Sequence, residues 1–304
     1  MARKSFAPEE GMWLKGNLHG HTTRSDGRLT PAEVLDGYSS RGYDFVSITD
    51  HDLVAAYNHP QLTCIPGFEL SGYIGEKPIH LNLWQKGEFS LFEEGTTFHL
   101  ESEEEMVELV RRCKEHYLIY LNHPAWSLLQ SGDLSHVDYL DGIEILNYST
   151  ETLNEVEGSI HLWECGLRAD RQWLAYGSDD NHNGFTDSPD WPFGNAECDS
   201  FGSYLMVKVK EQNVRSITHA IEMGHSYVSE GPHIHEFFVE DGLVHVRCSP
   251  AKKIICKGER RNFARRIGEG LTELITPLKG NELFVRVEIT DAEGRRAYSN
   301  PIYV

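Results

Sequence analysis

Polar residues stand at the carboxyl ends of a series of short apolar runs, and this feature constrains the fold more than any other. The runs are WLKGNLH, YDFVSITDH, LTCIPGFEL, PIHLNLW, YLIYLNH, DGIEILN and WLAYGSDD. Helical patterns lie between them, and such alternation favours parallel βα units. About seven strands with reactive residues at their carboxyl ends predict a barrel, which would gather those residues at one rim.

Capping signals mark where the intervening helices begin. Thr30-Pro31-Ala32-Glu33 is a capping box with proline at the first helical position. Ser102 opens the helical pattern MVELVRRCKEHY in a similar way. Asn213 is expected to cap VRSITHAIEMGH, and Gly224 suits the end of that helix.

The sequence pattern changes near Gly231. HEFFVEDGLVHVRCS, KKIICKGE, ELFVRVEITDAEG and RAYSNPIYV are β-rich and separated by turns such as Asp241-Gly242 and Glu293-Gly294. We therefore expect two domains, an α/β barrel over residues 1–232 and a small antiparallel β module over residues 233–304.

Charge and apolar content limit the partners of the chain. Its 304 residues carry a formal net charge of −19, which argues against long nucleic acids as partners. Small anions remain compatible, because bound metal ions would reverse the local field. No apolar window approaches a membrane span, and the six cysteines form no CxxC pair. A small-molecule substrate and a reduced, cytoplasmic setting are expected; the oligomeric state is left open.

Histidine and carboxylate residues recur at the strand ends in a pattern that predicts a metal site. His19 and His21 are two apart, which places both side chains on one face of a strand. The later members of the series are Asp26, His51, Glu69, His80, His123, Asp179, Asp180 and His182. Such ligands suit Zn²⁺, Mn²⁺ or Fe²⁺ rather than a soft thiolate site. Their number exceeds what one ion needs, so two or three divalent metal ions are expected.

The order HxH with SDG, then ITDHD, GFE, an isolated histidine, NHP and SDxNH resembles the PHP (polymerase and histidinol phosphatase) superfamily. The resemblance covers residues from about 12 to 232. IHLNLW, VSEGP and the C-terminal module are similar to the carbaryl-hydrolase-like branch of that superfamily. The resemblance implies a distorted (βα)7 TIM-like barrel, the PHP fold.

The resemblance also implies a division of the ligands among three metals. The first would be held by His19, His21, Glu69 and a motif aspartate, the second by Asp26, His51 and His182, and the third by Glu69, His80 and His123. Asp180 keeps the motif's spacing to His182 and is preferred, whereas Asp179 keeps the Ser-Asp pairing and stays an alternative. Glu69, Asp180 and His182 are the expected catalytic residues, because they would bridge the metals or position a metal hydroxide.

Three further acidic residues stand at strand ends. Asp50 and Asp52 flank His51, and each could orient a ligand histidine by accepting its second N–H or cap a loop. Glu144 in GIEILN is similarly placed. It is expected to support the ligands or the fold rather than to bind a metal.

Clustered divalent cations suit hydrolysis of a small phosphate mono- or diester. They lower the pKa of a bridging water and present hydroxide at neutral pH. Arg24, Arg28, Lys77 and Arg168 are candidates for a phosphate clamp, and Arg24 is the best placed of them. His225 is a further substrate-binding candidate at the last barrel strand. The expected substrate is a small phosphorylated molecule or nucleotide.

Two other functions remain open. The same metal hydroxide could attack a non-phosphate ester, carbamate or amide, with Trp84, Trp126 and Tyr148 lining an apolar pocket. The chain could instead be a non-catalytic metal- or glycan-binding protein that uses its β module. The nearly complete ligand series weighs against that last interpretation.

Overall fold

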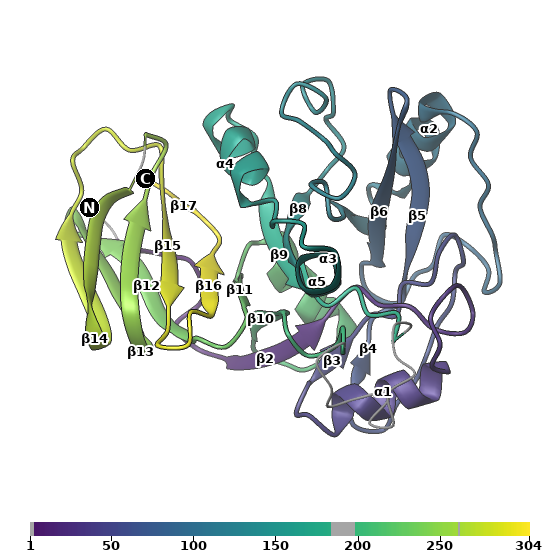
Figure 1. Cartoon of the computed structure of the whole chain (residues 1–304), viewed down its shortest axis with the longest axis horizontal. Coiled ribbons are helices and arrows are strands. Elements are labelled where there is room, and N and C mark those ends of the chain that lie inside the picture. Colours follow the sequence, from purple (N-terminus) through teal and green to yellow (C-terminus); the bar gives the residue numbers. More distant parts are fainter. Residues whose placement is uncertain (1–2, 184–197, 261) are drawn as a thin grey trace.

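Strands from both ends of the chain share one sheet of twelve strands, and a sheet of five strands lies beside it (Figure 1). The computed structural model describes residues 3–183, 198–260 and 262–304. In hydrogen-bonded order, the larger sheet runs through β1 (Lys4–Ser5), β12 (Ile234–Glu240), β13 (Leu243–Lys257), β15 (Phe284–Thr290), β16 (Arg296–Ser299), β11 (Ser226–Ser229), β10 (Tyr204–Val209), β2 (Met12–Asn17), β3 (Phe45–Val46) and β4 (Thr63–Cys64). Two more strands join it, β14 (Asn262–Pro277) on β13 and β17 (Ile302–Tyr303) on β15.

The smaller sheet and five helices complete the described part of the chain. The sheet runs through β5 (Gly67–Ile74), β6 (Lys77–Gln85), β7 (Tyr117–Leu121), β8 (Gly142–Asn147) and β9 (Leu174–Ser178). The helices are α1 (Pro31–Ser39), α2 (Glu103–Cys113), α3 (Tyr148–Asn154), α4 (Ile160–Arg168) and α5 (Val214–Glu222). None of these helices has the length and apolar content that crossing a membrane requires.

The predicted helix starts are confirmed by side-chain caps. Thr30 accepts from Glu33 N at 3.4 Å while the Glu33 carboxylate accepts from Thr30 N at 2.8 Å, which completes the capping box of α1. Ser102 caps α2 and Asn213 caps α5 through the same kind of bond. Gly224 follows α5 with φ +70°, a conformation that glycine adopts without strain. Each cap stabilises its helix by about 1 kcal/mol.

The expected (βα)7 barrel is not confirmed, because only part of the strand pairing is parallel. Strands β2, β3 and β4 pair in parallel, and so do β7, β8 and β9. In contrast, β5, β6 and β7 pair antiparallel, as do β2, β10 and β11. Only Gly75 and Glu76 separate β5 from β6, which is too short for a helical crossover. The described strands form a mixed α/β fold with no closed barrel.

The two sheets meet through isolated bridges at the ends of their strands. Gly20 pairs in parallel with Asn181, and His51 pairs in parallel with Glu69. A Cβ atom on Gly20 would lie 2.3 Å from Asn181 Oδ1, and this side-chain oxygen is held by a hydrogen bond from Tyr38 Oη at 2.8 Å, so glycine leaves room for the Asn181 side chain. The glycine between the two histidines of HGH therefore has a structural reason, and both bridges contain candidate metal ligands or their neighbours.

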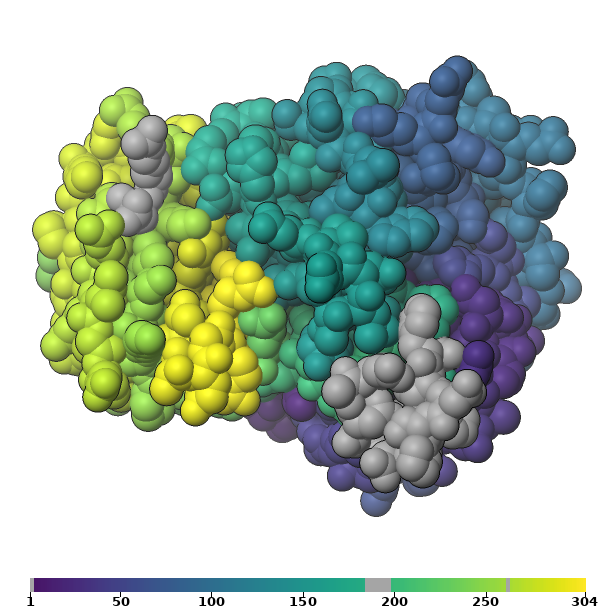
Figure 2. Space-filling model, viewed as in Figure 1, coloured from purple at the N-terminus to yellow at the C-terminus, as the bar shows by residue number. Residues whose placement is uncertain are grey.

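The chain from β12 onward pairs antiparallel. The hairpin from β12 to β13 turns at Asp241 and Gly242, whose φ values of 47° and 78° match a two-residue hairpin turn. In Figure 2 the C-terminal part of the chain, coloured light green to yellow, lies on one side of the molecule. The sheet continues without a break from β16 into β11, β10 and β2, and the division of the chain at residue 232 therefore stays a prediction.

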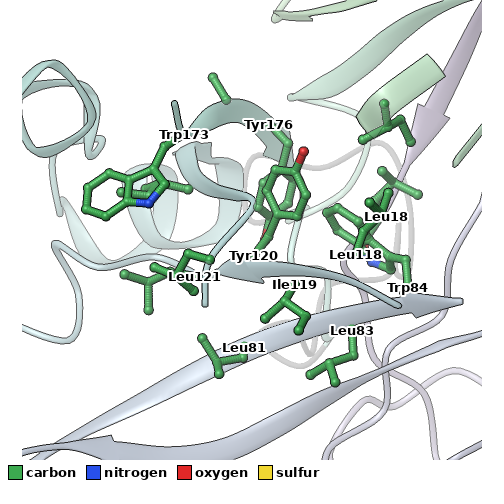
Figure 3. Packing of buried hydrophobic residues seen from close by; sticks show 14 of the residues in the cluster. Leu18, Leu81, Leu83, Trp84, Leu118, Ile119, Tyr120, Leu121, Trp173 and Tyr176 are labelled. Atoms are coloured by element: carbon green, nitrogen blue, oxygen red, sulfur yellow. The ribbon is translucent and has the colours of Figure 1, made fainter. Parts of the chain in front are cut away.

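A buried aromatic cluster supports the segment that carries the first histidines (Figure 3). Trp84 is fully buried, and its Nε1 donates to Leu18 O at 2.9 Å, one residue before His19. Its ring centroid lies 4.8 Å from that of Tyr120 and 4.9 Å from that of Tyr176. Burial of Leu18 itself contributes roughly 1.5–3 kcal/mol. The hydrophobic core thus fixes the backbone from which the histidine pair projects.

Candidate metal centre

His19 and His21 follow β2 and are held by backbone hydrogen bonds to the segment that follows β9. His21 N donates to Asn181 O at 2.8 Å, and Asp180 N donates to His19 O at 3.0 Å. Both imidazole rings are fully buried. These bonds fix the two segments against each other and place Asp180 beside the histidine pair.

The Asp180 carboxylate contacts both of these histidines. Its Oδ1 atom lies 3.1 Å from Nε2 of His19 and 3.1 Å from Nε2 of His21. Asn147, at the end of β8, donates from Nδ2 to Oδ2 of Asp180 at 2.9 Å. One carboxylate oxygen therefore faces the two ring nitrogens while the other is held by an amide.

Glu69 on β5 is buried at the centre of the histidines. Its Oε1 atom lies 3.1 Å from Nε2 of His19 and 3.2 Å from Nδ1 of His80. The same oxygen lies 3.4 Å from Nε2 of His123 and accepts a hydrogen bond from Asn122 Nδ2 at 2.7 Å. The Oε1 atom alone therefore connects three strands of the smaller sheet to the segment after β2.

The second oxygen of Glu69 extends the contacts towards another group of ligands. It lies 3.1 Å from Nε2 of His21 and 3.2 Å from Nδ1 of His51. Asp26, whose side chain is half exposed, lies 3.4 Å from Nε2 of His182 and 3.6 Å from Nε2 of His51. The predicted ligands thus form a continuous row rather than separate clusters.

The candidate ligands form three overlapping sets, and each set could hold a metal ion. Within each set, the ligand atoms all lie within 4.8 Å of one another. The sets are His21, Asp26, His51 and His182; His19, His21, Glu69 and Asp180; and His51, Glu69 and His80. Each pair of sets shares one residue, which is His21, His51 or Glu69, and of these the Glu69 carboxylate has two oxygens that could bridge neighbouring ions. His123 lies beside the last set through its contact with Glu69.

Buried polar atoms without hydrogen-bond partners provide a test of whether metal ions fit this row. They include Nε2 of His19, Nδ1 of His51, Nδ1 of His80 and Oε2 of Glu69. Each has close neighbours of opposite type without the geometry of a hydrogen bond. Buried polar atoms are rarely left in this state, whereas divalent cations take such nitrogen and oxygen donors. The donor set therefore fits divalent metal binding.

The charges of the row depend on one another. Burial lowers the pKa of His19, but Asp180 and Glu69 raise it well above its usual value overall. Burial raises the pKa of Glu69, but His19 and His80 lower it well below its usual value overall. Burial lowers the pKa of His182, yet Asp26 and Asp180 raise it to about 9. The buried carboxylates thus need positive charge beside them, which cations or protonated histidines supply.

Glu144 on β8 contacts two of the candidate ligands, His19 and His123. Its Oε1 atom lies 3.2 Å from Nδ1 of His19, whereas the other ring nitrogen, Nε2, faces Glu69 and Asp180. Its Oε2 atom accepts from His123 N at 2.8 Å and from Asn147 Nδ2 at 2.9 Å, and Ser178 Oγ donates to the same carboxylate. A carboxylate on the second nitrogen fixes the ring orientation and tautomer of a ligand histidine.

The other acidic residues of the motifs accept hydrogen bonds from backbone N–H groups of segments distant in the sequence. Asp50 accepts from Thr22 N at 2.8 Å, and Asp52 accepts from Ser71 N at 2.7 Å. Asp179 accepts from Ser203 N at 3.0 Å, and burial raises its pKa to about 6. None of the three carboxylates belongs to the ligand sets found among the described residues.

A cavity of about 500 Å³ opens over the row of ligands. It is lined by Asp26, Arg28, His51, Glu69, His80, His123, Trp126, Ser149, Thr150, Asn154, Asp180 and His182. The polar residues of α3 were missed at the sequence level, because no motif distinguishes them from other surface residues. Arg28 and Trp126, two of the substrate-binding candidates from the sequence, do line the cavity.

Four predicted substrate-binding residues do not line this cavity. The Arg24 guanidinium lies 5.9 Å from the ring centroid of Tyr57, and Lys77 pairs with Asp133 at 2.7 Å. The other two also have local contacts: Arg168 of α4 pairs with Glu164 at 3.2 Å, and His225 accepts a backbone bond from Lys208 at 3.0 Å. These four residues therefore make contacts elsewhere and are not part of the cavity wall.

Comparison with known proteins found no matching family model and no matching curated protein. Among solved structures, a two-domain protein containing a predicted PHP-like metal-dependent phosphoesterase, from Bacteroides vulgatus, matches over 98% of this chain and 97% of its own, with a TM-score of 0.54 and 16% identity. At that identity the likeness shows a shared fold.

Two further solved structures have lower TM-scores. A candidate metal-dependent phosphoesterase from Bifidobacterium adolescentis covers 72% of this chain and 98% of its own, with a TM-score of 0.45 and 15% identity. An amidohydrolase from Chromobacterium violaceum, with bound sulfate and no metal, covers 59% of this chain and 90% of its own, with a TM-score of 0.40 and 15% identity. The comparison over the whole length of the chain therefore rests on the Bacteroides vulgatus structure.

Proposed function

We propose that this chain is a PHP-superfamily metal-dependent phosphoesterase that hydrolyses a small phosphate mono- or diester. The observation that carries the proposal is the continuous row of histidine and carboxylate ligands at the base of an open cavity. Structural metal sites are closed by their ligands, whereas catalytic sites leave positions for water and substrate. An open row with shared ligands is suited to hydrolysis.

The row would hold two or three divalent ions such as Zn²⁺, Mn²⁺ or Fe²⁺. One set of ligands is His19, His21, Glu69 and Asp180, the next is Asp26, His51 and His182, and the last is Glu69, His80 and His123. When bound, such ions act as Lewis acids that lower the pKa of water and offset negative charge on a phosphoryl group. This proposal uses Asp180 rather than Asp179, because only Asp180 faces the histidines.

Neighbouring polar side chains hold the proposed metal ligands in position. Glu144 holds the Nδ1 side of His19, which leaves Nε2 directed at Glu69 and Asp180. Asn122 and Asn147 each hold one oxygen of the Glu69 and Asp180 carboxylates. These amide donors fix the carboxylates in one orientation, so the ligand set is organised before substrate enters.

Arg28 is the cation suited to bind the substrate's charge. It is exposed and is the one lysine or arginine among the described residues that line the cavity. Its guanidinium makes no hydrogen bond or ion pair with the described part of the chain, and it is thus available to a phosphoryl oxygen. The chemistry of the wall therefore favours an anionic substrate over a neutral ester or amide.

Hydrolysis assays on metal-replete protein test the proposal. Benzyl phosphate, bis-(4-nitrophenyl) phosphate and 4-nitrophenyl acetate represent monoesters, diesters and carboxyl esters. We expect phosphate hydrolysis that a chelator abolishes and Mn²⁺ or Zn²⁺ restores. Hydrolysis of carboxyl esters, carbamates or amides without phosphate hydrolysis would overturn the proposal in favour of carbonyl chemistry.

Metal analysis tests the site independently of the substrate. Glu69→Ala removes a carboxylate that contacts five histidines, and His182→Ala removes a ligand from the Asp26 end of the row. We expect both variants to lose bound metal relative to the parent protein. His136→Ala, which removes an exposed histidine paired with Glu103, is the matched control. Unchanged metal content in Glu69→Ala and His182→Ala would refute the site.

A further inference from the structure

Trp126 presents an exposed aromatic ring in the wall of the cavity. It belongs to the loop that follows His123 and is 45% exposed, although large aromatic side chains are usually buried. Its ring centroid lies 5.1 Å from that of His123 and 6.1 Å from that of His80. Among the described residues lining the cavity it is the only tryptophan, tyrosine or phenylalanine.

Arg28 lines the same cavity and lies beside His182. Its backbone N donates to His182 O at 2.9 Å. The His182 ring centroid lies 6.5 Å from that of His51, which lies 4.8 Å from that of His80. Contacts therefore lead from Arg28 through His182, His51 and His80 to Trp126, with candidate metal ligands between the cation and the aromatic ring.

The positions of Trp126 and Arg28 in the cavity bear on which substrates fit and how they are oriented. We propose that Trp126 stacks against a flat, unsaturated ring carried by the alcohol part of the phosphate ester, while the phosphoryl group lies over the ligands towards Arg28. The inference rests on the proposed phosphoesterase function and specifies its substrate. Preferred substrates are thus phosphate esters of alcohols that bear an aromatic ring.

The size and chemistry of the cavity support a ring rather than an arbitrary apolar group. A volume of about 500 Å³ is within the range of sites for compact organic molecules. Aromatic pairs gain attraction from offset or edge-to-face geometry beyond that from buried apolar area. The rest of the described wall is polar, including Ser149, Thr150 and Asn154 of α3, so Trp126 is the surface that selects the apolar part.

Three phosphate monoesters of equal charge test whether the cavity selects a flat ring or any apolar group on the alcohol part of the substrate. Benzyl phosphate and cyclohexylmethyl phosphate have similar bulk and similar leaving oxygens, but only the first carries a flat ring, and methyl phosphate lacks both features. We expect the parent protein to have the highest kcat/KM on benzyl phosphate. Trp126→Leu should reduce the benzyl to cyclohexylmethyl ratio roughly ten-fold, mainly through KM, whereas Trp126→Phe should keep most of it.

Leu128→Ala is the matched control. Leu128 lies two residues along the same loop and is 77% exposed, but it does not line the cavity. Leu128→Ala should leave the benzyl to cyclohexylmethyl ratio of kcat/KM unchanged. Adenosine monophosphate, assayed beside benzyl phosphate, shows whether the preferred ring is a nucleobase or a simple aromatic; a preference for either that depends on Trp126 supports the inference.

Binding of unreactive phosphonates distinguishes failure of this inference from failure of the proposed function. Calorimetry on the metal-loaded protein would compare benzylphosphonate with methylphosphonate in the parent and in Trp126→Leu, with metal content measured in both. An affinity ratio that Trp126→Leu leaves unchanged would overturn the ring subsite, even if phosphate esters are hydrolysed. A ratio that depends on Trp126 without phosphate hydrolysis would keep the subsite and overturn the reaction.

Discussion

Asp179 and Asp180 are adjacent in the sequence, yet their carboxylates lie in different environments. Asp179 accepts from Tyr38 Oη at 2.7 Å and from Gly202 N at 2.9 Å, so it holds the loop before β10. Asp180 has a φ of 53°, in the left-handed region, and its Oδ1 lies 3.1 Å from Nε2 of His19. The change in backbone conformation after β9 therefore separates a loop-binding carboxylate from one in the candidate metal centre.

Substitution of each aspartate by asparagine should separate metal binding from folding. Asp180→Asn should reduce metal content because it removes a charged ligand, and its buried partners should lose their compensating charge. Asp179→Asn should keep the metal but lower the free energy of unfolding by about 1–3 kcal/mol, because it weakens several buried hydrogen bonds. Metal analysis and urea denaturation measure the two effects. Metal loss from Asp179→Asn in a folded protein would contradict this division.

Gly20→Ala should damage the metal centre without touching a ligand. The added Cβ would meet Asn181 Oδ1 at 2.3 Å and displace the Asn181 side chain, which stands between Asp180 and His182 in the sequence. We expect at least a ten-fold weaker metal affinity, since ligand geometry is sensitive to small displacements. Gly132→Ala is the control, because a Cβ there meets no atom within 4 Å. Equal metal affinities in the two variants would show that the close approach is unimportant.

Arg28→Ala should weaken binding of phosphate esters more than Arg24→Ala does. Arg28 lines the cavity, whereas Arg24 lies over the Tyr57 ring. A hydrogen bond to a charged group is worth about 1.5–3 kcal/mol, so KM should rise roughly 10- to 100-fold in Arg28→Ala. Steady-state kinetics on one monoester measures both variants. A larger rise in KM for Arg24→Ala would show that Arg24, the candidate favoured by the sequence, binds the phosphate.

The site was more accessible to sequence reasoning than the topology. HxH, GFE and SDDNH lie directly after apolar runs, and local strand geometry is enough to direct such residues to one edge. Strand direction depends on connections and on pairing between distant segments, which periodicity does not encode. The two-residue link at Gly75 and Glu76 was a signal for an antiparallel pair that the barrel prediction ignored. Arg28 and Trp126 were among the candidates from the sequence, but no local pattern distinguished them from Arg24 and Trp84, which do not line the cavity.

Arg286 links the C-terminal strands to α4 through a buried cluster of charges. Its side chain is fully buried, contacts Glu164 of α4 through Nη2 and lies 2.8 Å from Glu288. Lys257 of β13 lies 3.1 Å from Glu164, and Arg168 of α4 lies 3.2 Å from the same carboxylate. Arg286→Ala would remove the fully buried cation of this cluster and should cost about 3–5 kcal/mol of unfolding free energy.

An exposed ion pair provides the comparison for Arg286→Ala. Arg247 and Glu236 lie 3.3 Å apart with both side chains exposed. Arg247→Ala should change the unfolding free energy by less than about 1 kcal/mol, because solvent screens such pairs. Urea denaturation of both variants makes the measurement. Similar losses in the two would mean that the buried cluster contributes no more than a surface contact.

The lowered pKa of Glu164 should make the free energy of unfolding depend on pH in the acidic range. Burial raises the pKa of Glu164, but Arg286 and Lys257 more than offset this and lower it to about 2, from an ordinary value of 4.5. The native state therefore favours the ionised carboxylate. Its contribution is complete above pH 4.5 and is lost as the pH falls towards about 2.

Glu164→Gln isolates that contribution from those of other carboxylates. The difference in unfolding free energy between parent and variant should be constant above pH 4.5 and shrink as the pH falls towards 2. Urea titrations at a series of pH values measure it, at constant ionic strength because the partners are charged. A difference that stays constant across this window, or grows towards acid, would mean that the pKa of Glu164 is not depressed by Arg286 and Lys257.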